Sequence, residues 1–241
     1  MHTIDFERLA LCDGMAVLDL GCGEGRHIHG LYYAADMTCL GMDLSFEDVL
    51  HTRKGFDAYP DFSGDRGQCY GLACADALHL PLPDASLDRV ICCEVLEHLP
   101  DYHTALAEIS RITKPGAIFA MSVPRAWPER ICWNLSEEYH NTPGGHVRIF
   151  DAKVLRRDIE GTGFRYLGKH YAHGLHAPYW WLKCLLWARR DDHPLILAYK
   201  RFLEWDIISR PLLTRALEAV SAPFMGKSVV MYFERVDKDG S

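Results

Sequence analysis

The sequence feature that most constrains the fold is a run of three alternating glycines directly after a short apolar segment. Residues 16–20 are typical of a short buried strand, the glycines follow within residues 21–25, and a helix-like run begins at His27. Glycines at a strand-to-helix turn let the backbone approach a ligand closely, where a Cβ would clash. The pattern therefore predicts an open α/β sheet with a ligand site at the carboxyl end of its first strand.

The spacing of these glycines distinguishes two classes of nucleotide ligand. The dinucleotide-binding fingerprint is G-x-G-x-x-G/A, whereas this chain reads G-x-G-x-G and has Arg26 where the third small residue should stand. Asp19, two residues before the first glycine, is an anion placed to receive a cationic group, which the pyrophosphate of NAD does not offer. A nicotinamide-dependent oxidoreductase is therefore disfavoured, and a bare glycine-rich turn is the plain alternative.

Three strings in the first half of the chain carry a resemblance to a known family. VLDLGCGEGRH, at residues 17–27, resembles motif I of the class I S-adenosylmethionine methyltransferases, whose ligand carries an ammonium, a carboxylate and a sulfonium. With DRVICCEVLEHLPD and EISRITKPGAIFAMSVP, over about residues 15–125, it resembles the UbiE/UbiG-like branch of that family. The resemblance implies a doubly wound, seven-stranded, Rossmann-like α/β sheet with an antiparallel last strand, and S-adenosylmethionine as the cofactor.

The resemblance also implies cofactor roles for residues near the ends of four strands. Asp43 would accept hydrogen bonds from the ribose hydroxyls, and Asp76 would bind the adenine amine; the alternative for Asp76 is a carboxylate that caps its own loop. The implied cofactor-binding set is Asp19, Gly21, Cys22, Gly23, Gly25, Arg26, Asp43, Leu44, Asp76, Ala77 and Glu94.

Apolar runs and capping residues predict where the elements lie. Strands are expected at residues 16–20, 38–43, 69–75, 89–94, 117–123, 164–171 and 228–234. Ser45, Asp101 and Asp151 precede helical patterns and are predicted N-caps. The segment 55–67 is rich in Asp, Gly and Pro and is expected to be a solvated loop.

The segment Glu94-x-x-Glu97-His98 is the candidate reacting centre. Methyl transfer from a sulfonium is an in-line displacement, so the protein must position a nucleophile and deprotonate it if it is weakly acidic. If the strand gives way to a helical turn at Glu94, residues three and four apart share one face. We predict Glu94, Glu97, His98 and His146 as the catalytic residues.

The E-x-x-E-H string is similar to that of ubiquinone-type O-methyltransferases and of small-RNA 2′-O-methyltransferases. In the latter, a further histidine after the fifth strand completes a metal site, and His146 stands in about that place, with His140 as a second candidate. The resemblance implies Glu94, Glu97, His98 and His146 as ligands of Mg²⁺, Mn²⁺ or Zn²⁺. Two alternatives stay open: His98 as a base or pocket-lining residue without metal, and a structural role.

A long segment between the sixth and seventh expected strands is rich in aromatic residues. It holds four of the six tryptophans, and it has seven Lys/Arg against five Asp/Glu although the net charge of the chain is −7. We predict a core of residues 1–174 and 227–241, with a helical cap inserted at residues 175–226. The tryptophans are Trp180, Trp181, Trp187 and Trp205.

Two apolar repeats within this segment have helical spacing, and three interpretations of the cap stay open. The repeats are Leu195, Tyr199, Phe202 and Leu203, and Leu213, Leu217 and Val220. The cap could supply ordinary core helices or an aromatic-walled pocket for a hydrophobic or glycosylated substrate. It could also make a peripheral membrane contact through residues 175–222, with tryptophan at the interface.

Composition limits the remaining choices. The net charge of −7 argues against a large nucleic-acid-binding face. Nine cysteines without a C-x-x-C pair favour reduced thiols over disulfides or zinc. Neither a signal-peptide pattern nor a run of about 18 apolar residues is present, so we expect a cytoplasmic protein, with membrane association as an open alternative.

These observations predict a methyltransferase that uses S-adenosylmethionine. We expect the acceptor to be a small-molecule, glycosylated or lipid-linked compound, methylated at a hydroxyl oxygen with or without a divalent metal. Methylation of carbon in a quinone-like ring and a non-catalytic S-adenosylmethionine-binding protein are the alternatives.

Overall fold

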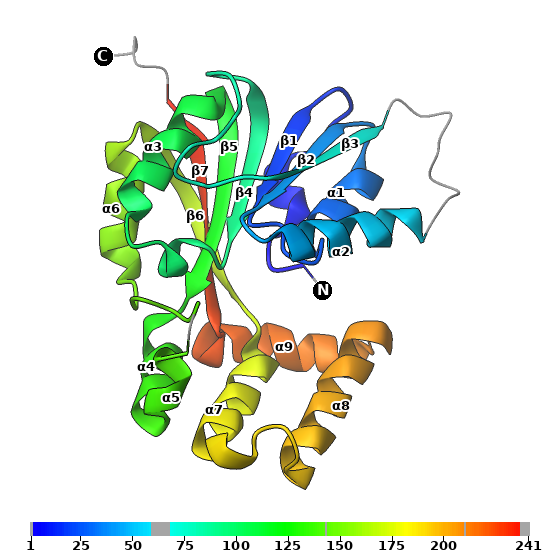
Figure 1. The fold of residues 1–241 in the computed structure, drawn as a ribbon, viewed down its shortest axis with the longest axis vertical. Coiled ribbons are helices and arrows are strands. Elements are labelled where there is room, and N and C mark those ends of the chain that lie inside the picture. Colours follow the sequence, from blue (N-terminus) through cyan, green and yellow to red (C-terminus); the bar gives the residue numbers. More distant parts are fainter. Residues whose placement is uncertain (1, 59–67, 143, 210, 237–241) are drawn as a thin grey trace.

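A single mixed sheet of seven strands forms the centre of the computed structural model, which describes residues 2–58, 68–142, 144–209 and 211–236 (Figure 1). The strand order is β3-β2-β1-β4-β5-β7-β6, and β7 runs antiparallel to both of its neighbours. The strands are β1 (Ala16–Leu20), β2 (Thr38–Asp43), β3 (Cys69–Cys74), β4 (Leu87–Cys93), β5 (Thr113–Pro124), β6 (Phe164–Ala172) and β7 (Ser228–Arg235). The predicted doubly wound sheet with an antiparallel last strand is confirmed.

Helices cover both faces of the sheet and its carboxyl edge (Figure 1). The helices are α1 (Ile28–Ala34), α2 (Phe46–Asp57), α3 (Tyr102–Ile112), α4 (Ala126–Leu135), α5 (Glu137–His140), α6 (Ala152–Gly161), α7 (Ala177–Leu185), α8 (Pro194–Ser209) and α9 (Leu212–Met225). Short 3₁₀ turns are η1 (Phe6–Leu9), η3 (Leu96–His98), η4 (Gly174–His176) and η5 (Trp187–Arg189). The side chains of Ser45, Asp101 and Asp151 accept hydrogen bonds from first-turn backbone N–H groups, so all three predicted N-caps are confirmed.

Successive side chains of the central strands face opposite sides of the sheet, so the core has two layers, one on each face. Val17 and Leu18 are both fully buried and point to opposite faces of β1. Leu18 belongs to the layer that packs α3 and α6 against the sheet, and Val17 to the layer that includes α1 and the N-terminal residues Ile4 and Leu9. The strand order reverses between β1 and β4, and in open α/β sheets ligands bind at such a reversal, outside the carboxyl ends of the strands.

The predicted loop at residues 55–67 is partly wrong. Helix α2 continues through Gly55 to Asp57, because Phe56 is buried and its ring stacks on Tyr70 of β3, with 3.9 Å between the ring centroids. Tertiary packing of this kind outweighs the low helix propensity of one glycine. Residues 59–67 lie outside the described part of the chain.

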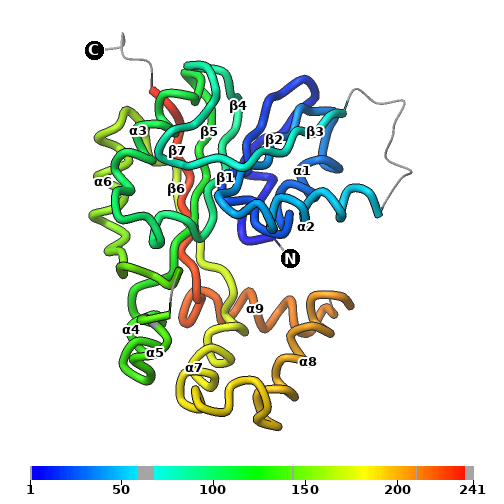
Figure 2. The backbone as a smooth tube through the Cα atoms, viewed as in Figure 1, coloured from blue at the N-terminus to red at the C-terminus, as the bar shows by residue number. Residues whose placement is uncertain are grey.

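The long segment between β6 and β7 forms α7, η5, α8 and α9, which lie beyond the edge where β1, β4 and β5 end (Figure 1). Figure 2 shows the backbone leaving β6, passing through these helices and returning to β7. The two apolar repeats identified the helices, but Leu195, Leu213, Leu217 and Val220 are exposed. No helix among the described residues is long and apolar enough to cross a bilayer.

Candidate functional site

The turn between β1 and α1 leaves open space beside one glycine and none beside the other two. Gly21, Gly23 and Gly25 all have positive φ, at +73°, +51° and +90°, which favours glycine. A Cβ on Gly21 would lie 2.1 Å from Val95, and one on Gly25 would lie 2.3 Å from the His29 ring. A Cβ on Gly23 would meet nothing within 4 Å. The turn therefore presents bare backbone to the crevice at Gly23, where a cofactor can approach.

Asp43 joins the glycine turn to the end of β2. Its Oδ2 accepts a hydrogen bond from the Gly23 backbone N–H at 2.9 Å, and its Oδ1 accepts one from Ser45 at the same distance. Beyond it, Leu44 is a large apolar side chain that is 71% exposed, which suits a position covered by the adenosine of a ligand. Asp43 therefore stabilises the glycine turn, in addition to its expected role in binding the ribose.

Asp19 lies beneath the turn and is fully buried. Its Oδ2 accepts a hydrogen bond from the Ile28 N–H at the start of α1, and its Oδ1 has no partner among the described residues. Burial raises the pKa of Asp19 to about 7, against the lowering effect of the Ile28 hydrogen bond. An unpartnered buried oxygen fits the expectation that Asp19 faces a cationic group.

The remaining residues of the expected cofactor set differ in burial. Cys22 and Ala77 are buried, and Arg26 and Asp76 are exposed. Oδ1 of Asp76 accepts a hydrogen bond from the Leu78 N–H, so Asp76 does cap its loop, and its adenine role stays a prediction.

Glu94 does not belong to the group of possible metal ligands that the other three predicted catalytic residues form. It has a positive φ of +55°, and its Oε1 accepts a hydrogen bond from the Ser122 hydroxyl of β5 at 2.7 Å. The helical turn begins only at Leu96, as the 3₁₀ turn η3, so Glu94 and Glu97 do not share a helical face. Strained backbone of this kind is typical of functional sites, and Glu94 lies between the cofactor turn and the reacting centre.

Glu97, His98 and His146 form a compact group at the end of β4. One ligand atom from each lies within 4.8 Å of the others. Glu97 Oε1 is 4.0 Å from His146 Nε2, and the His98 and His146 ring centroids are 5.0 Å apart. The Glu97 carbonyl accepts a hydrogen bond from the Val147 N–H, which holds the loop of His146 against η3. The structure thus brings together three of the four residues predicted as metal ligands.

The Glu97 carboxylate is the most unusual group in this site. It is fully buried, and neither oxygen has a hydrogen-bond partner among the described residues. Burial raises the pKa of Glu97 well above its ordinary value, and the Glu94 carboxylate adds to the rise. A buried carboxylate without partners is costly, and either a proton or a cation would relieve that cost.

Glu129 of α4 is a functional candidate that the sequence did not reveal. Its buried carboxylate lies 2.6 Å from His146 Nδ1 and accepts hydrogen bonds from Trp133 Nε1 at 3.2 Å and the Tyr139 hydroxyl at 3.4 Å. Burial alone would raise the pKa of Glu129, but the His146 hydrogen bond and charge bring it below its ordinary value. No spacing or motif marks Glu129, because its position depends on how α4 packs.

Aromatic rings connect the cap to the group of Glu97, His98 and His146. The Tyr139 ring lies 6.1 Å from His146, 6.0 Å from Trp180 and 5.9 Å from Trp187, measured between centroids. Lys227 places its Nζ 4.6 Å from the centre of the Trp180 ring. Two of the four cap tryptophans therefore lie beside Tyr139, the ring next to His146, whereas Trp205 lies on the surface.

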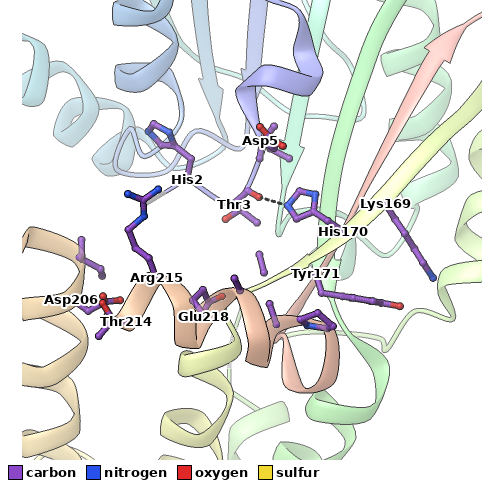
Figure 3. A pocket seen from close by; sticks show the side chains of 16 residues that line it. His2, Thr3, Asp5, Lys169, His170, Tyr171, Asp206, Thr214, Arg215 and Glu218 are labelled. Atoms are coloured by element: carbon purple, nitrogen blue, oxygen red, sulfur yellow. Dashed lines mark hydrogen bonds between the residues drawn. The ribbon is translucent and has the colours of Figure 1, made fainter. Parts of the chain in front are cut away.

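A cavity of about 760 Å³ lies elsewhere, between the N-terminal segment, the end of β6 and α9 (Figure 3). Its walls include Thr3, His170, Asp206 and Glu218, and none of the predicted site residues lines it. His170 Nε2 lies 3.2 Å from the Thr3 carbonyl across one wall.

The chain is similar to known methyltransferases. Residues 18–121 match a family model described as a methyltransferase domain. A Mycolicibacterium smegmatis protein named "Probable S-adenosylmethionine-dependent methyltransferase" is 33% identical over 166 residues, which are 68% of this chain and 57% of that protein. An O-methyltransferase of Pyrenophora dematioidea is 32% identical over 163 residues, 66% of this chain and 58% of that protein. The chain thus spans somewhat over half the length of these relatives.

Solved structures share the fold over the whole chain. The structure of an S-adenosylmethionine-dependent methyltransferase from Methanosarcina mazei aligns over 98% of this chain and 99% of that chain, with a TM-score of 0.63. The sequence identity is 13%, so the likeness shows the fold alone. The glycine turn, the sheet order and the match over residues 18–121 together show that the chain belongs to the class I S-adenosylmethionine-dependent methyltransferases.

Proposed function

We propose that this protein methylates a hydroxyl oxygen of a small-molecule or lipid-linked acceptor, and that Glu97, His98 and His146 hold a divalent cation during the reaction. The observation that carries the proposal is the fully buried Glu97 carboxylate, which has no hydrogen-bond partner among the described residues and lies beside two imidazoles. The name of the Pyrenophora dematioidea relative supports oxygen as the methylated atom.

The hydrogen bonds of the two histidines prepare their other nitrogens to bind a cation. His98 Nδ1 lies 3.2 Å from the Gly145 carbonyl, and His146 Nδ1 lies 2.6 Å from Glu129. Since a carbonyl and a carboxylate only accept, each Nδ1 carries a proton, and in the neutral imidazole each Nε2 then has a lone pair for a cation. Such outer partners are typical of metal-binding histidines, because they fix the tautomer and the ring orientation.

The donor set fits a small divalent cation. Two imidazole nitrogens and one carboxylate leave coordination positions for an acceptor hydroxyl and for water. When bound, S-adenosylmethionine supplies the methyl on a sulfonium, and the cation lowers the pKa of a coordinated hydroxyl. Glu97 and the histidines orient the acceptor, and Trp180 and Trp187 limit the access of water to it.

A cation-dependence experiment tests this proposal. The full chain is incubated with S-adenosylmethionine and a panel of phenols, sugars and hydroxylated lipids, and S-adenosylhomocysteine is measured with a chelator and after addition of Mg²⁺, Mn²⁺ or Zn²⁺. We expect the chelator to abolish turnover and one of the cations to restore it. Turnover unaffected by the chelator would instead support a metal-free base at His98.

A second arm separates the enzyme from a non-catalytic binder. S-adenosylmethionine is titrated into the protein by calorimetry, and Mn²⁺ is titrated into wild type, Glu97→Gln and Glu160→Gln. Glu160→Gln, on the remote helix α6, is the matched control. Cofactor binding without turnover on any acceptor would favour a binding protein, and equal Mn²⁺ affinity in all three variants would contradict the metal site.

A further inference from the structure

Helix α9 carries its large apolar side chains on the outside of the molecule. Leu213, Leu217, Val220 and Phe224 recur at intervals of four, three and four residues, so they form one stripe, and all four are exposed. The opposite side of the helix has a threonine, a glutamate and an alanine, Thr214, Glu218 and Ala222, which pack inward. This order is the reverse of a surface helix in a soluble protein, whose apolar stripe faces the core.

The end of α8, where it meets α9, also carries exposed apolar side chains, although Ile196 and Leu203 earlier in the helix are buried. Ile208 at its end and Leu212 at the start of α9 are each 81% exposed, while Asp206 is buried. Trp205 lies on the exposed side of α8, three residues before Ile208. Figure 1 shows that the two helices meet at the end of the cap that is farthest from β6 and β7, on the side of the cap that faces α2 and the N-terminus. An apolar corner therefore projects there, formed by Ile208, Leu212 and Leu213.

The charged side chains near this corner are only partly sorted by sign. Two acids turn inward: Asp206 is buried, and both carboxylate oxygens of Glu218 accept hydrogen bonds from the backbone N–H groups of Gly174 and Leu175. The exposed Glu204 is paired with Lys200. Exposed Arg201 and Arg215 have no ion-pair partner within the ranges that the structure describes. The corner is thus bordered by free cations, although the chain as a whole carries a net charge of −7.

Arg201 lies in the same stripe as the outward apolar residues of α8. Leu197, Arg201, Trp205 and Ile208 follow one another at intervals of four, four and three residues, and all are exposed. Arg215 stands one turn after Leu212, lines the cavity between α9 and the N-terminal segment, and points toward that segment (Figure 3). A tryptophan and cations around projecting leucine and isoleucine match what an anionic bilayer requires: apolar side chains enter the acyl boundary, and cations contact phosphates.

We propose that the corner of α8 and α9 binds the surface of an anionic lipid bilayer. The occupant is a lipid surface and not a second protein, because the apolar residues project at a corner and the exposed charges that the structure describes around them are three cations, Lys200, Arg201 and Arg215, against one acid, Glu204. The inference does not depend on the methyl acceptor or on a cation at Glu97, since none of the corner residues belongs to that group. Bilayer binding would place the cap, and the aromatic rings at its root, beside lipid-linked acceptors.

Vesicle sedimentation of the full chain tests the proposal. Phosphatidylcholine vesicles with and without phosphatidylglycerol are mixed with the protein, and the bound fraction is measured at low and high salt. We expect binding to the anionic vesicles to exceed binding to pure phosphatidylcholine by about tenfold or more, and to weaken at high salt. Equal, negligible sedimentation with both vesicles would overturn the proposal.

Two sets of variants locate the surface. Leu212→Gln with Leu213→Gln should reduce binding by about tenfold or more, and Arg201→Glu with Arg215→Glu should abolish the preference for anionic lipid. Val154→Gln with Leu167→Gln is the matched control, because these residues on α6 and β6 are 50% and 49% exposed. All substitutions are at exposed positions, and near-ultraviolet circular dichroism checks that each variant is folded.

Light scattering in the absence of lipid distinguishes a lipid surface from an interface between copies. We expect a molar mass that does not depend on protein concentration. A dimer that the Leu212→Gln and Leu213→Gln substitutions dissociate would show that the apolar corner binds another copy of the chain, and it would overturn the lipid proposal.

Discussion

Two parts of the candidate site differ in how their carboxylates are hydrogen-bonded. At the glycine turn, which we call the cofactor half, both Asp43 oxygens accept hydrogen bonds from backbone N–H groups. At the group of Glu97, His98, His146 and Glu129, which we call the reaction half, the Glu97 carboxylate is buried and accepts no hydrogen bond from the part of the chain that the structure describes. The Asp43 carboxylate is hydrogen-bonded within the protein, whereas the charge of Lys227 only partly offsets the burial of the Glu97 carboxylate. We infer that S-adenosylmethionine binds to a cofactor half whose Asp43 carboxylate is already hydrogen-bonded. A cation bound in the reaction half would supply the partner that the Glu97 carboxylate needs.

The largest effect on cation binding and turnover is expected from substitution of Glu97. Glu97→Gln keeps the volume of the side chain but removes its charge, so cation affinity should fall by more than about a hundredfold, beyond the loss typical of an outer partner. Turnover should be abolished, and S-adenosylmethionine affinity should stay nearly unchanged. Calorimetry with Mn²⁺ and with S-adenosylmethionine measures both, and Glu160→Gln is the control. A matching loss of S-adenosylmethionine affinity would show that the two halves are not independent.

Glu129→Gln tests whether the reaction half depends on its outer partner. The glutamine amide cannot hold His146 Nδ1–H as a carboxylate does, so we expect cation affinity to fall by about 10–100-fold. Glu129→Asp should recover part of that affinity. The measurement is Mn²⁺ titration together with the visible spectrum of bound Co²⁺, which reports ligand geometry. A loss of stability with an unchanged Co²⁺ spectrum would show that Glu129 has a structural role and does not position His146 for a cation.

Asp43→Ala should act on the cofactor half alone. The substitution removes the acceptor of the Gly23 and Ser45 N–H groups as well as the expected ribose contact, so S-adenosylmethionine binding should weaken by about 1–3 kcal/mol. Asp57→Asn, at the end of α2, is a surface control. Mn²⁺ affinity should not change. An unaltered S-adenosylmethionine dissociation constant would exclude the ribose role of Asp43.

The same contrast explains how far the sequence could predict the site. β1 and β2 have the predicted bounds, because an apolar run followed by glycine or by an acid is a local signal. The residues of the cofactor half lie within a few positions of those strand ends. The reaction half draws on η3, α4 and the loop before α6, and Glu129 reaches His146 only because α4 packs beside α7. A contact between distant segments leaves no periodic pattern in the sequence.

The cap shows a different failure of sequence reasoning. Apolar residues at helical spacing identified α8 and α9, since the period depends only on helix geometry. The usual assumption that the periodic face packs inward does not hold for α9, because Leu213, Leu217 and Val220 are exposed. In α8 it holds in part, because Leu203 is buried while Leu195 is exposed, and the three interpretations of the cap stay predictions.

The smallest expected effect tests the one exception within the cofactor half, since Asp19 also has an oxygen without a partner. Burial raises the pKa of Asp19 to about 7, above the value of about 3.9 for an unfolded aspartate. The folded state therefore binds more protons than the unfolded state between these values, so the free energy of unfolding should fall as the pH rises. From pH 5.5 to 6.5 the fall is at most about 1.4 kcal/mol.

Denaturant unfolding of wild type and Asp19→Asn at these two pH values measures this dependence, which the substitution should remove. S-adenosylhomocysteine should also flatten it in the wild type, because an ammonium beside Asp19 favours the ionised carboxylate and lowers its pKa. If the ligand binds and the slope persists, the carboxylate does not face the cationic group, and Asp19 serves only to hold the start of α1.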